Sequence, residues 1–301
     1  MKKQAGKFPK IVVILGPTAT GKSDLAVYIA QKFGGEVVSA DSRQVYKGLN
    51  IGSGKITEKE KRGIPHHLLD IADPKKIYNA EKFREDGTKA VREILKRKKL
   101  PVICGGTGFY IDALVHNERF PDAPPNKKLR KRLEKKSAEN LMKTIIKLDP
   151  RRAGTLDPYN KVRIIRAIEI AKTLGKVPKV KRVKQYETLF IGLLLSRAKL
   201  RERIHARLLK RMKAGMVREI SSLHRNGVSW KRLFDLGLEY RYVSLYLRNK
   251  MTWREMLAKL EQEICQFAKR QMQWFKRNKN IKWFAPGKNA RIKKELTKFI
   301  K

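Results

Sequence analysis

The chain has 301 residues, and its 72 Lys and Arg against 28 Asp and Glu give a formal net charge of +44. The hydrophobic fraction of 41% is enough for a folded core, and the length corresponds to about two domains. Apolar stretches stay short of the ~18 residues of a membrane helix, and residues 1–10 lack the apolar region of a secretory signal. Two cysteines exclude a disulfide framework and a cysteine-rich zinc site. We therefore expect a monomeric, cytoplasmic protein without a membrane partner.

The positive charge favours a polyanionic partner, because a chain with this much like charge repels itself. Nucleic acid is the first candidate, and an anionic membrane surface is the second. The alternative is a lysine bias of the whole proteome, which would leave every surface basic. Charge therefore supports a function but does not identify one.

The first hundred residues alternate between apolar strands and helical patterns. Strands are predicted at 11–15, 37–40 and 101–104, and helices at 23–33 and 83–95. Apolar strands that alternate with helices are typical of a parallel sheet covered on both faces.

Residues 16–23 (GPTATGKS) match the phosphate-binding pattern G-x-x-x-x-G-K-[ST] between a buried strand and an amphipathic helix. Backbone N–H groups of such a loop surround a phosphate at a helix N-terminus. The lysine reaches the terminal phosphate oxygens, and the serine hydroxyl can ligate Mg²⁺. The residues expected to bind a di- or triphosphate are Gly16, Pro17, Thr18, Ala19, Thr20, Gly21, Lys22 and Ser23, with Ser23 as the metal ligand.

Asp41 follows the second strand, at the sheet edge where open α/β sheets bind ligands. Its carboxylate can act as a general base or approach Mg²⁺, and the alternative is a turn-forming aspartate. Thr107 lies at the same edge, in the loop 105–108 (GGTG).

A helical insertion interrupts the α/β pattern near residue 120. Three prolines at 121–125 break the chain, and residues 127–136 (KKLRKRLEKK) hold seven basic residues and one acidic residue. A helix over 160–173 and a basic stretch over 176–184 follow. A strand at 189–195, helices over 201–226 (broken near Gly215) and 252–278, and an edge strand at 281–284 complete the chain.

We expect an α/β fold: a P-loop NTPase-like core, with a parallel sheet flanked by helices, and a small all-helical insertion domain. The core comprises residues 1–119 and 188–301, and the insertion comprises 120–187. Two functions are compatible with these residues. One is a P-loop kinase of a small molecule or nucleotide, with Asp41 as the base. The other is an enzyme of the same architecture that acts on a large nucleic acid held by the insertion. A P-loop motor ATPase suits the chain less, because no strand ends in a Walker-B acid followed by a catalytic Glu.

Six separated segments resemble the bacterial tRNA dimethylallyltransferases (tRNA isopentenyltransferases). They are residues 16–23, 41–52 (DSRQVYKGLNIG), 64–70 (IPHHLLD), 105–110 (GGTGFY), 163–169 (RIIRAIE) and 268–275 (AKRQMQWF). The matches run in order along nearly the whole chain, and no Cys/His zinc finger follows residue 284 as it does in eukaryotic members. The family usually shows Gly-Tyr-Arg where this chain has 237–241 (GLEYR), which leaves the role of Arg241 open.

The resemblance implies transfer of a dimethylallyl group from dimethylallyl diphosphate to N6 of the adenosine immediately 3′ of the tRNA anticodon. It implies that residues 16–23 hold diphosphate and not ATP, with Mg²⁺ as the cofactor. It further implies that Asp41 is the general base and that Thr107 is needed for activity. The tRNA-contacting positions that it implies are Asp41, Ser42, Arg43, Gln44, Arg130, Val162, Arg163, Ile164, Ile165 and Arg166.

Overall fold

The computed structural model describes residues 8–301, so most of the segment in which we looked for a secretory signal lies outside the described residues. Two compact units are present: one comprises the chain up to Asn117 together with Lys184–Lys301, and the other is Glu118–Val183. These bounds differ from the expected 120–187 at both ends, and Glu187 is the first residue of a core strand. No helix within residues 8–301 is long and apolar enough to cross a membrane.

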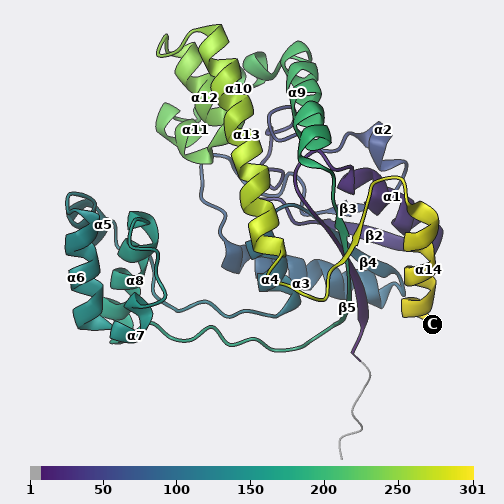
Figure 1. Ribbon diagram of the computed structural model, residues 1–301, viewed down its shortest axis with the longest axis horizontal. Coiled ribbons are helices and arrows are strands. Elements are labelled where there is room, and N and C mark those ends of the chain that lie inside the picture. The colour runs from purple at the N-terminus through teal and green to yellow at the C-terminus, as the bar shows by residue number, and fades with distance from the viewer. Residues whose placement is uncertain (1–7) are drawn as a thin grey trace, which may run out of the picture. The chain divides into compact units, whose positions relative to one another are not determined.

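A six-stranded parallel sheet forms the centre of the first unit, in the order β3-β2-β4-β1-β5-β6 (Figure 1). Its strands are β1 Lys10–Leu15, β2 Gly35–Ser39, β3 His66–His67, β4 Leu100–Cys104, β5 Glu187–Leu193 and β6 Lys282–Phe284. The predicted parallel sheet and its apolar strands are confirmed. The edge strand β3 was not predicted, because two residues are too short to show an alternating pattern.

The helices of this unit are α1 Lys22–Phe33, α2 Glu58–Lys61, α3 Ala80–Lys96, α4 Gly108–Val115, α9 Arg197–Lys213, α10 Met216–Arg225, α11 Trp230–Leu236, α12 Leu238–Leu247, α13 Trp253–Phe275 and α14 Asn289–Ile300. The predicted helix over 201–226 is broken at Gly215, whose φ of +97° is left-handed. Helix α13 begins with the expected capping box of Thr252 and Glu255.

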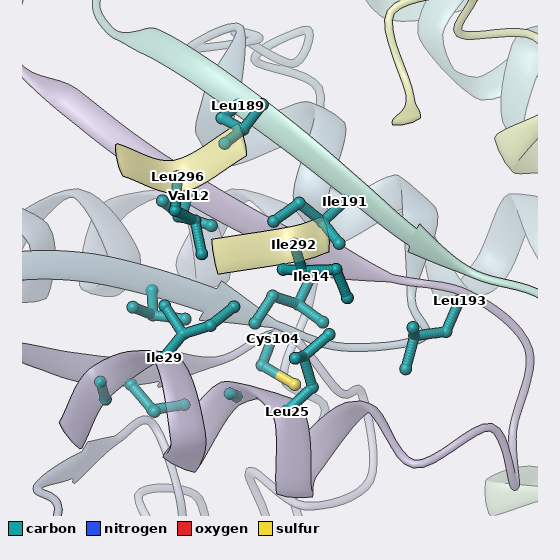
Figure 2. Packing of buried hydrophobic residues seen from close by; sticks show 14 residues of the cluster. Val12, Ile14, Leu25, Ile29, Cys104, Leu189, Ile191, Leu193, Ile292 and Leu296 are labelled. Atoms are coloured by element: carbon teal, nitrogen blue, oxygen red, sulfur yellow. The ribbon is translucent and has the colours of Figure 1, made fainter. Parts of the chain in front are cut away.

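Helices α1 and α14 cover one face of the sheet. Figure 2 shows Leu25 and Ile29 of α1, and Ile292 of α14, packed with Ile14 and Ile191 of the sheet. The chain moves from β1 through α1 to β2, and then back through α3 to β4. Crossovers between parallel strands are right-handed as a rule, and these two run in opposite directions along the sheet, which puts α1 and α3 on opposite faces. The loops that follow β1, β2 and β4 lie together at one edge of the sheet.

The second unit consists of α5 Lys127–Glu134, α6 Ala138–Leu148, α7 Pro150–Ala153 and α8 Lys161–Leu174. Leu141, Ile145 and Ile164 belong to its own apolar core. The carboxylate of Glu169, 1% exposed, accepts two hydrogen bonds from the Arg130 guanidinium at 2.8 and 2.7 Å. This pair ties α5 to α8, and it lowers the pKa of Glu169 against the opposing effect of burial.

Candidate active site

The loop 16–23, which we call the P-loop, turns sharply between β1 and α1. Gly16 has a φ of +141°, and a Cβ there would lie 2.5 Å from the carbonyl oxygen of Leu193. Gly21, with a φ of +87°, immediately precedes α1. The backbone between these glycines is thus folded tightly ahead of a helix N-terminus, as phosphate binding requires.

Bonds inside the P-loop fix its shape. The carbonyl oxygen of Pro17 accepts hydrogen bonds from the Thr20 hydroxyl at 2.9 Å and from Lys22 Nζ at 2.6 Å. Burial lowers the pKa of Lys22 to about 8, with a smaller contribution of the same sign from the Arg207 guanidinium. Lys22 is partly shielded from water, and an ammonium group in such a place binds an incoming anion more strongly because water competes less for it.

Asp41 lies just beyond β2 and shapes the turn that follows it. Its Oδ1 accepts the backbone N–H groups of Arg43 at 2.8 Å and of Gln44 at 3.2 Å. Within residues 8–301, both of these hydrogen bonds go to Oδ1, and Oδ2 faces away from the turn's N–H donors. The turn therefore uses Oδ1 only, so a turn-forming aspartate and a general base acting through Oδ2 are compatible interpretations of Asp41.

The loop 105–108 lies against the loop of Asp41. A Cβ on Gly105 would lie 2.1 Å from the carbonyl oxygen of Ala40, so only glycine allows this approach. Thr107 donates its N–H to Ala40 O at 3.2 Å, and its Oγ1 accepts the N–H of Ser42 at 3.1 Å. Thr107 thus holds the Asp41–Ser42 backbone in place.

Two arginines of α9, one turn apart, reach the same region from a distant part of the chain. The Arg207 guanidinium lies 3.5 Å from Thr18 Oγ1 and donates to the carbonyl oxygen of Gly54 at 3.1 Å. Arg211 donates to Gly52 O at 2.8 Å. Burial, followed by the charge of Arg211, lowers the pKa of Arg207.

Sequence reasoning missed both arginines, because a helix rich in basic residues was interpreted only through its apolar stripe. Arginines at 203, 207 and 211 recur every four residues, which puts them on one helix face. That spacing is the signal that could have found them.

Two cavities meet at Asp41. The first, of about 380 Å³, is lined by the P-loop residues Lys22 and Ser23. The second, of about 310 Å³, is lined by Ser42, Arg43 and Thr107. Both are also lined by the same five side chains: Thr18, Asp41, Ser53, Arg207 and Phe267. A phosphate in the first cavity and a reacting group in the second would therefore face each other across Asp41.

The expected tRNA-contacting residues 41–44 lie together at the two cavities, and Asp41 lines both. Ser42 and Arg43 line the second cavity, whereas Gln44 lines the first, where its Nε2 donates to Gly54 O at 3.3 Å.

Behind the P-loop, Cys104 is a buried thiol whose pKa is raised to about 12 by burial.

The expected tRNA contacts of the insertion differ in their exposure. Ile164 and Ile165 are buried in the core of the second unit, 0% and 7% exposed, so their side chains do not reach a ligand. Arg130 is already engaged by Glu169. Val162, 79% exposed, and Arg163 are open to solvent, and Arg166 is half-buried beside Glu169. A contact surface on this helix is thus reduced to its first turn and Arg166.

Oxygen ligands for a cation are few. Ser23, Asp24 and Asp41 line the first cavity, and residues 8–301 contain no group of three or more His, Cys, Asp or Glu that could hold a metal. Mg²⁺ suits such a set, since it keeps several waters and is usually bound by one or two protein oxygens plus phosphates of the substrate.

Comparison with known proteins shows the family to which the chain belongs. The model of the IPP transferase family matches residues 44–278. A tRNA dimethylallyltransferase of Syntrophus aciditrophicus is 43% identical over 275 residues, 89% of each chain. One of Treponema denticola is 45% identical over 272 residues, 88% of this chain and 91% of its own.

Solved structures similar to this chain are of the same kind of enzyme. The full-length tRNA isopentenylpyrophosphate transferase of Bacillus halodurans superposes with a TM-score of 0.74 at 33% identity, covering 96% of both chains. A eukaryotic dimethylallyltransferase acting on tRNA superposes with a TM-score of 0.79 at 27% identity, covering 92% of this chain and 74% of its own.

Proposed function

Because the chain belongs to the IPP transferase family and is an enzyme that prenylates tRNA, we propose that its two cavities hold the two substrates of that reaction. Dimethylallyl diphosphate occupies the first cavity, and the adenine immediately 3′ of the anticodon enters the second. The observation that carries this assignment is the set of side chains shared by both cavities, with Asp41 among them. The P-loop kinase that the motif had left open is not favoured by these relatives.

The first cavity suits the diphosphate of the donor. Backbone N–H groups of the P-loop and of the first turn of α1, the Lys22 ammonium and the Arg207 guanidinium provide positive potential. Arg207 adds a cation from α9, beside Thr18. Such fixed donors stabilise the diphosphate most as it departs, when its negative charge is greatest.

Mg²⁺ would be held by the Ser23 hydroxyl together with diphosphate oxygens. Its chemistry would be neutralisation of the leaving group. Asp24 and Asp41 line the same cavity and can accept hydrogen bonds from waters on such an ion.

Asp41 then removes a proton during transfer. The N6 lone pair forms a bond to C1 of the dimethylallyl group, and the C1–O bond breaks with its electrons moving to diphosphate. N6 becomes positively charged and loses its proton to Oδ2 of Asp41. Oδ1 stays bonded to the N–H groups of Arg43 and Gln44, which keeps the carboxylate oriented.

The adenine must leave its stack to enter the second cavity. A cavity of about 310 Å³ beside Asp41 and Thr107 receives a single extruded base. Anticodon loops are single-stranded, which lowers the cost of extrusion. We further propose that the basic helix α5 and the first turn of α8 bind tRNA phosphates, and that the enzyme acts as a monomer in the cytoplasm, where tRNA is available.

The experiment that tests this function uses the full chain with unmodified tRNA. The protein is incubated with Mg²⁺ and dimethylallyl diphosphate, and the tRNA is digested to nucleosides for mass analysis. We expect one prenylated adenosine per tRNA. Phosphoryl transfer from ATP to a small hydroxyl compound, without any prenylated adenosine, would refute the assignment.

A further inference from the structure

Gln271 joins two loops of the site that are far apart in the sequence. Its Oε1 accepts the backbone N–H of Thr18 at 2.9 Å, and its Nε2 donates to the carbonyl oxygen of Gly106 at 2.9 Å. The side chain belongs to α13 and is 6% exposed. One amide therefore bonds the P-loop with one atom and the Thr107 loop with the other.

The loop 105–108 is shaped to receive this amide. A Cβ on Gly106 would lie 2.3 Å from Nε2 of Gln271. One turn further along α13, Trp274 occupies the space that a Cβ on Gly108 would need, 2.2 Å from the nearest ring atom. Two of the three glycines in this loop thus make room for α13, and Gln271 is the side chain that reaches through to the P-loop.

Each half of the site also has bonds of its own. Within the P-loop, Pro17 O accepts bonds from Thr20 and Lys22. On the other side, Thr107 holds Ser42, and Asp41 closes its own turn. Removal of the Gln271 amide would leave both sets intact and would break the side-chain tie between the two loops. Their bases would stay joined by the β1–β4 pairing, in which Gly105 N–H donates to Ile14 O at 3.1 Å.

We propose that Gln271 is a positioning residue that sets the separation between the diphosphate cradle and the loop that holds the target base. The inference rests on the proposed function, because it assigns donor and acceptor to the two sides that Gln271 connects. Transfer requires C1 of the donor and N6 of the acceptor to approach in line, and a misplacement of about 1 Å can cost roughly 100-fold in rate. Each substrate is bound chiefly by its own cavity: the diphosphate by Lys22 and Ser23 of the P-loop, and the base beside Thr107.

The test is Gln271→Met, which keeps the length of the side chain and removes both hydrogen bonds. Single-turnover transfer at saturating tRNA and donor should slow by about 10–100-fold. The affinities for inorganic diphosphate with Mg²⁺, and for tRNA, should change little. Gln273→Met is the matched control, because it makes the same substitution at an exposed position of the same helix and should transfer at the parent rate.

A second variant protects the test against a folding defect. Gly106→Ala leaves Gln271 in the sequence but displaces its amide, the end of a flexible side chain, so it should show the same loss of rate with retained affinities. Saturated rates equal to that of Gln273→Met, or losses confined to the two affinities, would overturn the inference. Failure of the parent enzyme itself to prenylate tRNA would instead overturn the proposed function on which the inference rests.

Discussion

Asp41→Asn is the sharpest test of the chemistry, because the structure separates the two roles of the carboxylate. Oδ1 accepts two backbone N–H groups, from Arg43 and Gln44. An asparagine keeps these bonds only if its carbonyl oxygen takes the Oδ1 position, since an NH₂ group there would face two donors. The NH₂ group must therefore stand where Oδ2 receives the proton, and it cannot accept one.

The magnitude follows from this geometry. With the turn preserved, the loss is that of the general base alone, ~10²–10⁴-fold in rate, or about 3–5 kcal/mol of activation free energy. Asp41→Ala should lose the same chemistry and also leave two N–H groups without their acceptor. We expect it to lower the free energy of unfolding further, by about 1–3 kcal/mol.

The assay is single-turnover prenylation of tRNA at saturating donor, with the affinity for tRNA and the unfolding midpoint measured on the same preparations. Asp41→Asn should keep the affinity and midpoint of the parent while its rate falls. A rate close to the parent's would refute the reasoning and leave Asp41 as a turn-forming residue only.

Three further outcomes are expected. Burial lowers the pKa of Lys22 to about 8, so its ammonium loses its charge above that pH and the affinity for diphosphate should decline as the pH rises past 8. Calorimetric titration with diphosphate measures this decline, and Lys22→Met should not show it. Arg130→Ala removes the main partner of the buried Glu169 and should lower the free energy of unfolding in urea by about 1–3 kcal/mol. Glu169→Gln should recover part of this loss in the double variant, and additive losses would contradict the pairing. Arg163→Ala should flatten the salt dependence of tRNA binding by slightly under one unit of log–log slope, and Lys288→Ala should leave it unchanged; equal effects would indicate a diffuse charge atmosphere.

Local pattern was sufficient for much of the site. The P-loop needs only a buried strand, eight residues and a helix start, and all three are contiguous in residues 11–33. Asp41 and Thr107 each follow an apolar strand directly. Because parallel strands end at the same sheet edge, their proximity follows from the strand assignments alone.

The basic residues were harder to assign, because a charged side chain carries no local sign of what it contacts. Arg130 stands in a run of cations that is typical of a nucleic-acid surface, yet it is paired with a buried carboxylate 39 residues later. Ile164 and Ile165, which the family resemblance implied as tRNA contacts, are packed inside the second unit. Their burial is decided by how α8 packs against α5 and α6 within this unit.

Arg207 and Gln271 show the remaining limit. They lie 189 and 253 residues after Thr18. The helix of Arg207 shows an apolar stripe for packing, and the segment 268–275 around Gln271 resembles the family without indicating which loops the amide contacts. The strands and the P-loop follow from residues close together in the chain, whose backbone preferences and alternation act locally. The groups that close the site come from α9 and α13, and their place depends on how those helices pack against the sheet edge, which is a property of long-range contacts.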